Sequence, residues 1–254
     1  MSDQKNSCID EALFLRACDY VRGLEKGAMG IGTIGEKTIH AIMKYYYAPN
    51  PAYHERKVGS YVADIMLDGE ILEIQTRAFQ NLRRKLDVFL PEHEVTVIYP
   101  VAHTKWLSWI DPETGEVTKP RKSPKTGTIY RLIPELYKLK MYLKSERLHF
   151  TIPLIDVLET RILDGWSKDK KRGSHRDDGV PVGIFDEVRI NKREDYHVLL
   201  PDGLPAEFTV KDYKCAARVP VGVASTALNI LFSLDLVERT GKQGNAFVYR
   251  VSEA

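Results

Sequence analysis

Apolar and polar positions alternate along residues 52–77, and two turn signals divide this segment into three strand-like runs. The dipeptides Gly59-Ser60 and Asp68-Gly69 are both typical of two-residue hairpin loops. The segment is therefore predicted to form three antiparallel strands joined as a meander. Before it, residues 9–25 carry apolar side chains at helical spacing, and a second helix is expected over about residues 36–47.

The pattern after the meander predicts further helices and strands. A helix is expected at about residues 79–90, followed by a strand over the apolar run EVTVIYPVA at 94–102. A hairpin is expected around DPETG at 111–115. Residues 131–163 indicate a helix and then a long apolar segment that fits either a strand or a helix. The order of helix, meander, helix and strand indicates an α/β fold.

The composition changes after residue 163, where an apolar segment gives way to DGWSKDKKRGSHRDDG. We expect a first domain over residues 1–163, a basic and polar linker over 164–193, and a small second domain over 194–254. Residues 205–251 predict a helix, a turn, a second helix and a hairpin, an order that resembles a winged helix-turn-helix domain. The exposed face of its second helix carries no Lys or Arg, so a contact with DNA through Asn229 and a contact with protein both stay open.

The composition of the chain says more about its cellular compartment than about its binding partners. The chain of 254 residues has a net charge of only +2, so any electrostatic attraction to a partner must be local. Its three cysteines are scattered, without the spacing of metal ligands, which favours a reducing cytoplasm. No apolar run approaches the length of a membrane span, so no association with a membrane is expected.

The predicted turns fix which meander residues face one another. If Leu67 faces Glu70 across the second turn, Asp64 faces Glu73. The same reasoning at the first turn places Glu55 opposite Asp64. Three carboxylates then lie in one row on one side of the sheet, where opposed like charges are destabilising. Either a solvated sheet face or a bound divalent cation explains such a row, and apolar residues on both faces of these strands favour the cation.

Asp64 and the Glu73-x-Gln75 element, within the order helix, meander, helix and strand, resemble the PD-(D/E)XK nuclease superfamily, which includes restriction endonucleases and Holliday-junction resolvases. The resemblance covers about residues 30–101 and implies a restriction-endonuclease-like core. Asp64 matches the first motif acid, Glu73 the second, and Gln75 the position usually held by Lys. Glu36 matches a further acid on the preceding helix, and His40 on the same helix fits either the site or a partly buried packing position.

The resemblance implies a metal-dependent DNA endonuclease that hydrolyses phosphodiester bonds. Asp64, Glu73 and Glu55 would hold Mg²⁺, with Mn²⁺ as a substitute, and Gln75 would orient water or a phosphate oxygen. The implied substrate is double-stranded or branched DNA, and a homodimer is compatible because cutting both strands needs two sites. Two alternatives stay open: a non-catalytic DNA-binding regulator with a degenerate nuclease-like core, and a nuclease that acts on RNA.

Positive charge gathers in two segments, residues 117–147 and 168–176. Beside a nuclease-like core such segments are expected to contact phosphates, although a solvated face is the simpler explanation. From the final hairpin, Lys242 is included as well. The residues expected to bind nucleic acid are Lys119, Arg121, Lys122, Lys125, Lys170, Lys171, Arg172 and Lys242.

Overall fold

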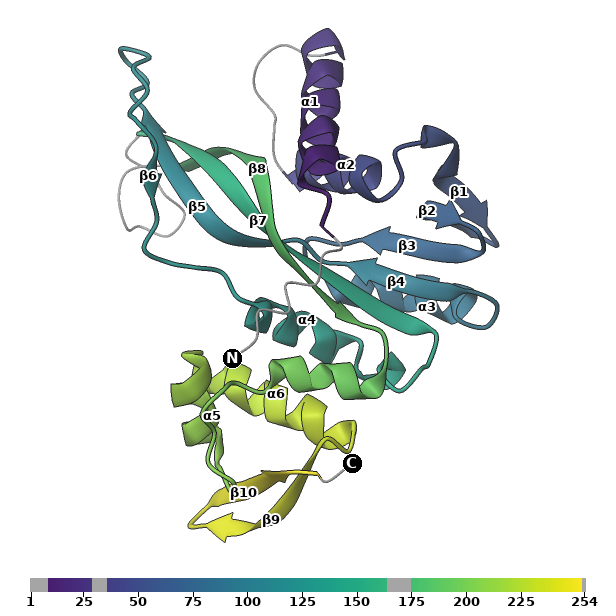
Figure 1. Cartoon of the computed structure of the whole chain (residues 1–254), viewed down its shortest axis with the longest axis vertical. Coiled ribbons are helices and arrows are strands. Elements are labelled where there is room, and N and C mark those ends of the chain that lie inside the picture. Colours follow the sequence, from purple (N-terminus) through teal and green to yellow (C-terminus); the bar gives the residue numbers. More distant parts are fainter. Residues whose placement is uncertain (1–8, 29–35, 164–174, 253–254) are drawn as a thin grey trace.

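The computed structural model describes residues 9–28, 36–163 and 175–252 and has a mixed α/β architecture (Figure 1). Its large sheet has the strand order β1-β2-β3-β4-β7-β5-β6, and β8 pairs with β7. The first three strands are an antiparallel meander, whereas β3, β4, β7 and β5 run parallel to one another. The strands are β1 His54–Val58, β2 Tyr61–Leu67, β3 Glu70–Ile74, β4 Glu94–Ile98, β5 Val101–Ile110, β6 Arg121–Lys122, β7 Leu148–Ile162 and β8 His175–Ile190.

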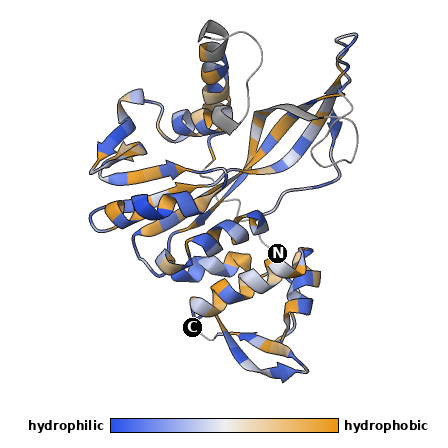
Figure 2. Ribbon diagram, turned by 180° about the vertical axis from the view of Figure 1, so that it is seen from behind, coloured by the Kyte–Doolittle hydropathy of each residue, from blue (hydrophilic) through white to orange (hydrophobic). Residues whose placement is uncertain are grey.

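Helices cover both faces of this sheet. On one face, α1 (Glu11–Ala28) and α2 (Glu36–Tyr47) bury Phe14, Ile42 and Met43 against strand residues such as Ile74. On the other face, a short 3-10 helix (Phe79–Leu82), α3 (Arg83–Phe89) and α4 (Ile133–Lys138) pack on a second apolar cluster. Figure 2 shows hydrophobic residues along the central strands and a hydrophilic tip on the hairpin beyond β5. Burial of apolar surface on both faces is the main stabilising contribution to such a sheet.

The C-terminal unit consists of α5 (Val210–Ala217), α6 (Val221–Ser233) and a hairpin of β9 (Val237–Gln243) and β10 (Ala246–Val251). Thr209 and Asp212 form a capping box at the start of α5. The apolar cluster on the α4 side of the sheet continues into α6 through Leu228 and Leu231. Among the described residues no single helix could span a membrane, and α5 and α6 meet the criteria of length and composition only as a pair bent by 111°.

Helix α6 is docked on the sheet domain by polar contacts as well. Lys140 donates to the side-chain oxygen of Asn229 at 2.7 Å, and Lys144 forms an ion pair with Asp235 at 3.0 Å. The sequence analysis kept contact with DNA through Asn229 as one alternative. In the structure this side chain instead accepts a hydrogen bond from another part of the protein. Contact with nucleic acid through this side chain would require α6 to separate from the segment around α4.

The expected α/β class and the meander are confirmed, and the segment that fitted either a strand or a helix is the strand β7. The hairpin around DPETG is also present, because Ile110 bridges to Val117. One expectation is wrong: residues 175–190 form β8 and do not belong to a linker. This strand pairs with β7 along its length and buries Ile184 and Ile190. The pairing with β7 therefore determines its structure, although its first residues are polar. Residues 164–174 lie outside the described residues.

Gly127 allows the chain after β6 to lie directly against β5. A Cβ atom at this position would meet the carbonyl oxygen of Ala102 at 2.0 Å, and the Gly127 N–H donates to the His103 carbonyl at 2.8 Å. We expect Gly127→Ala to lower the free energy of unfolding by about 1–3 kcal/mol, because the backbone must move to relieve the overlap. Urea denaturation measures the change. Gly222→Ala, at a helical position with open space around it, should be neutral or slightly stabilising.

Candidate active site

The meander has the register that its two turns predict. The observed cross-strand pairs are Val58–Tyr61, Lys57–Val62, Arg56–Ala63, Leu67–Glu70, Met66–Ile71 and Ile65–Leu72. One further step along the strands places Asp64 beside Glu73, and Glu55 occupies the position opposite Asp64 on β1. The register of the neighbouring residues is therefore the predicted one, although neither Glu55–Asp64 nor Asp64–Glu73 is itself a backbone-paired position.

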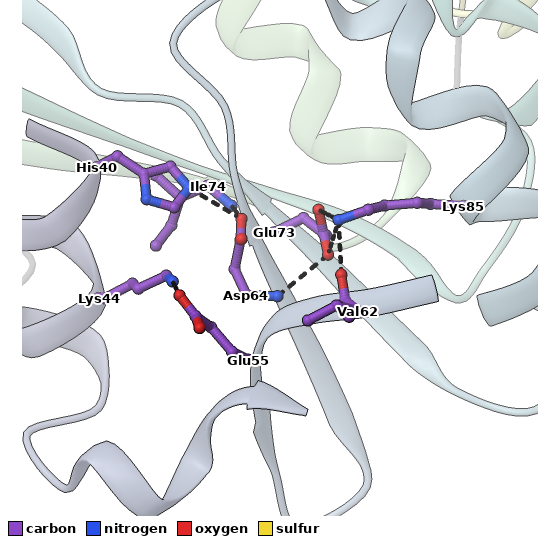
Figure 3. A network of polar contacts seen from close by, with 8 residues as sticks. All are labelled: His40, Lys44, Glu55, Val62, Asp64, Glu73, Ile74 and Lys85. Carbon is purple, nitrogen blue, oxygen red and sulfur yellow. Dashed lines mark hydrogen bonds and ion pairs between the residues drawn. The ribbon is translucent and has the colours of Figure 1, made fainter. Parts of the chain in front are cut away.

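The three carboxylates do not point to one side of the sheet, and that expectation is wrong (Figure 3). Asp64 contacts His40 on α2, whereas Glu73 contacts Lys85 on α3, and the two helices cover opposite faces. Glu55 turns to a third cation, on α2. The physical reason is the repulsion between directly opposed like charges, which separate cationic partners relieve.

Asp64 lies between helix α2 and the end of β3. Its Oδ2 is 3.2 Å from Nε2 of His40 and accepts a hydrogen bond from the Ile74 N–H at 2.9 Å. Burial opposes ionisation of this carboxyl group, but the hydrogen bond and the charge of His40, with the Ile74 N–H, hold its pKa below the usual value. Asp64 is therefore the ionised acid of the pair, and His40 belongs to the site.

Glu73 is fully buried. The Nζ of Lys85 donates to both Glu73 oxygens, at 2.8 and 2.9 Å, and to the Val62 carbonyl at 2.8 Å. Oε1 of Glu73 also accepts a hydrogen bond from the Asp64 N–H at 3.3 Å. Burial and the nearby Asp64 carboxylate raise the pKa of Glu73 to about 7, although Lys85 acts in the opposite direction. The site thus holds two neighbouring acids whose pKa values are shifted in opposite directions.

Glu55 is not brought together with the other two acids. Its carboxylate is 2.9 Å from Nζ of Lys44, and the side chain is 74% exposed. The hydrogen bond and charge of Lys44 lower the pKa of Glu55. Glu55 also has a positive φ of 51°, which removes it from the regular β1–β2 pairing. The structure gives this residue an ion-pair role at the margin of the site and does not support it as a metal ligand.

The two remaining site residues border this centre. Gln75 follows β3, its side chain is half-buried, and its N–H donates to the Ile98 carbonyl at 2.9 Å. Glu36 is the first residue of α2, one helical turn before His40. The side chain of Glu36 lies outside the described residues.

Lys85 is the residue that the sequence did not reveal. It lies on α3, outside any motif, and its contacts with Glu73 depend on how that helix packs on the sheet. A general signal was present: a carboxylate in a doubly buried strand needs a cationic or hydrogen-bonding partner. That rule says that a partner exists without saying which residue supplies it.

A divalent cation fits this site only in part. Asp64 and Glu73 supply carboxylate oxygens, the ligands that Mg²⁺ prefers. Within the described ranges, however, no group of three His, Cys, Asp or Glu side chains is arranged to hold a metal ion. Binding would require Glu73 to exchange Lys85 for the cation.

The residues expected to bind nucleic acid are placed as follows. Lys119, Arg121, Lys122 and Lys125 are exposed in the segment that follows the hairpin beyond β5. Lys242 lies on β9, with its ammonium group 5.1 Å from the centre of the Phe247 ring. Lys170, Lys171 and Arg172 lie outside the described residues. The structure therefore places four of the cations in one segment and a fifth on the C-terminal hairpin.

Comparison with known proteins identifies relatives without a described activity. Residues 37–191 match a family described as a domain of unknown function, DUF8091. A Treponema pallidum (strain Nichols) protein with the description "Uncharacterized protein" is 32% identical over 146 residues, which cover 56% of this chain and 58% of that protein. No solved structure matches. Because the matched region is more than half of the chain and contains Asp64, Glu73 and Lys85, the chain belongs to the DUF8091 family.

Proposed function

We propose that the protein is a metal-dependent nuclease that hydrolyses phosphodiester bonds in DNA. One observation carries the proposal: Glu73 is fully buried, its pKa is raised to about 7, and it lies beside Asp64 and Lys85. Removing an ionisable acid from water beside a second acid costs free energy, and a role in catalysis would account for a residue with such a cost. Strongly shifted acids of this kind concentrate at catalytic sites.

The chemistry follows from the roles that these side chains can fill. Asp64 and Glu73 would hold Mg²⁺ or Mn²⁺, with Glu36 as a third donor, and the ion would acidify a bound water and neutralise charge on the phosphate. Lys85, once released from Glu73, would donate hydrogen bonds to a phosphate oxygen or to water, the role that the resemblance gives to Gln75. His40 would hold Asp64 in place and keep it ionised.

The arrangement of the chain around the site also supports the proposal. Helix α2, the β1–β3 meander, helix α3 and the parallel strand β4 follow one another in the order of a restriction-endonuclease-like core. We interpret the C-terminal unit as winged-helix-like, and the free thiols of Cys18 and Cys215 fit a cytoplasmic setting. Dimerisation is part of the proposal only for cleavage of both strands of a duplex.

A second candidate is a non-catalytic DNA-binding protein with a degenerate nuclease-like core. It is favoured by one observation: each of the three carboxylates already has a basic side chain as its partner, namely His40, Lys85 or Lys44. In that case the ion pairs stabilise the junction of the meander with its helices, and the exposed cations provide binding alone.

Incubation of the full chain with nucleic acids decides between these functions. Supercoiled plasmid, a four-way DNA junction and single-stranded RNA would each be incubated with Mg²⁺, with Mn²⁺ or with EDTA. We expect nicked or shortened DNA only where a divalent cation is present. Binding of DNA without cleavage under any of these conditions would favour the regulator, and cleavage of RNA alone would assign an RNA-acting nuclease.

A further inference from the structure

Strands β5, β7 and β8 extend together beyond the rest of the sheet as a three-stranded ribbon (Figure 1). One face of this ribbon packs against α1. Ile155, Val157 and Ile184 belong to the same apolar cluster as α1 residues, and Arg22 of α1 donates to the Pro181 carbonyl at 3.1 Å. The opposite face, which we call the open face, consists of the side chains that alternate with these residues.

A row of four side chains crosses the open face. Trp106 of β5 pairs with Lys122 of β6 on one side and with Leu158 of β7 on the other, and Leu158 pairs with Val180 of β8. Cross-strand partners share a face, and Leu158 follows Val157, which faces α1. The indole of Trp106 is 38% exposed. The row therefore presents a large aromatic surface beside a lysine.

Two irregularities on either side of β7 add a second aromatic surface. Leu154 pairs with Asp186 but Ile155 pairs with Ile184, so Phe185 is an extra residue in β8. A second register shift lies between Ala102 and Lys105 of β5. The rings of His103 and Phe185 stack in parallel, 4.1 Å apart, and Phe185 is 57% exposed. Bulges commonly redirect side chains at functional sites, and here they produce a flat two-ring platform.

Positive charge lies along the edge of this face. Lys122 belongs to the row, and Lys119, Arg121 and Lys125 are exposed in the same segment. Arg121 pairs with Leu107 and therefore points to the other face of the ribbon. In the part of the chain that the structure describes, none of these four cations forms an ion pair with an acid. Lys105, whose side chain lies toward α1, is instead neutralised by Glu159 at 2.8 Å. Unneutralised cations beside exposed rings match a ligand that has both phosphates and flat aromatic groups.

We propose that the open face binds an unpaired stretch of nucleic acid, with bases stacked on Trp106 and Phe185 and phosphates held by Lys122 and its basic neighbours. A duplex hides the faces of its bases, so these exposed rings distinguish a single strand from a duplex, whereas the cations alone would not. This inference rests on the proposed function for the choice of nucleic acid as partner. It adds that the preferred substrate contains unpaired nucleotides.

Binding measured in EDTA tests the inference independently of cleavage. Fluorescence anisotropy would compare a labelled thymidine oligonucleotide with its duplex, using the full chain. We expect tighter binding to the single strand, and about tenfold or more loss of affinity in Trp106→Ala and Phe185→Ala, because stacking contributes about 1–3 kcal/mol per base. Trp106→Phe should keep most of the affinity. Lys122→Gln should lower the slope of log K against log salt by about 0.7.

Tyr20→Ala is the matched control, since Tyr20 is an exposed aromatic residue on α1, which covers the opposite face of the ribbon. It should bind like the wild type. Equal affinity for single strand and duplex, or wild-type affinity in both ring-removing variants, would overturn the inference and leave the nuclease proposal intact. A dimer that Trp106→Ala dissociates, with unchanged oligonucleotide binding, would assign the face to a second copy of the chain. If the ring-removing variants lose affinity for the single strand but the wild type never cleaves nucleic acid with a divalent cation, the binding proposal would stand and the nuclease proposal would fail.

Discussion

Replacement of Glu73 by Gln is expected to reduce metal-dependent DNA cleavage by roughly a thousandfold, because a metal ion contributes several kcal/mol and each 1.36 kcal/mol is tenfold in rate. The amide preserves the shape of the side chain but is a far weaker ligand for a divalent cation than a carboxylate. It also removes a fully buried acid from the neighbourhood of Asp64. The free energy of unfolding is therefore expected to change little, since the cost of ionising Glu73 disappears while Lys85 loses its ion pair.

Single-turnover cleavage with Mg²⁺ measures the loss, and urea denaturation measures the stability. Glu70→Gln is the matched control on the same strand, because Glu70 is exposed and its carboxylate accepts a hydrogen bond from Thr96. It should cleave at the wild-type rate. Cleavage by Glu73→Gln at a rate similar to the wild type would remove Glu73 from the chemistry and favour the non-catalytic DNA-binding candidate.

The register of the acidic row could be predicted because two-residue loops determine strand pairing locally. Once Gly59-Ser60 and Asp68-Gly69 are recognised as turns, the pairing of Val58 with Tyr61 and of Leu67 with Glu70 follows. No tertiary information enters this step. The same local rule explains why the meander and its place in the α/β order were accessible from the sequence.

The directions of the side chains could not be predicted, because regular alternation fails at the site itself. Ala63 belongs to the apolar cluster on the α3 side, whereas Ile65, two residues later on β2, belongs to the cluster on the α2 side. In a regular strand, residues two apart share a face. The interruption at Asp64 coincides with contacts to His40, which is 24 residues earlier in the chain. Cationic partners on distant helices therefore decide where each carboxylate points.

The docking of α6 shows a similar limit. Its sequence suggests an exposed face with Asn229 in reach of a partner, but Lys140 from the segment after α4 takes that side chain. Likewise, the polar residues before residue 180 suggest a linker that continues to residue 193, whereas pairing with β7 places 175–190 in the sheet. In both cases contacts between segments far apart in the sequence outweigh the local composition.

Replacement of Lys85 by Met is expected to lower the free energy of unfolding by about 1–2 kcal/mol at about pH 8 and by more at higher pH, since removal of one partner leaves a buried charge uncompensated. Met keeps the length of the side chain, so packing changes little. Lys144→Met is the matched control: its ion pair with Asp235 is largely exposed on both sides and should contribute less than about 1 kcal/mol. Urea denaturation of both variants across a range of pH measures the difference.

The loss of stability in Lys85→Met should increase with pH. The sign of this pH dependence follows from the pKa of Glu73. Lys85 is the group that lowers the pKa of Glu73, so its removal raises a pKa that burial and Asp64 already hold near 7. An acid with a raised pKa in the folded state favours folding while it is protonated, and this contribution is lost as the pH rises from about 4.3 through the folded-state pKa. The pH-dependent part of the deficit should therefore be small at about pH 5, appear near pH 7, and increase until the pH exceeds the raised pKa of Glu73 in the variant.

The double variant Lys85→Met with Glu73→Gln identifies the origin of this deficit. It should recover most of the stability lost at high pH, because no buried carboxylate remains to be ionised, and its stability should change little with pH. A constant part of the deficit is expected from the Val62 carbonyl, which also loses its hydrogen bond from Lys85. A deficit independent of pH in the single variant and not recovered in the double variant would mean that Lys85 acts through packing and the Val62 carbonyl alone. The ion pair with Glu73 would then contribute nothing to folding, and the argument for a strained acidic pair at this junction of strands and helices would fail with it.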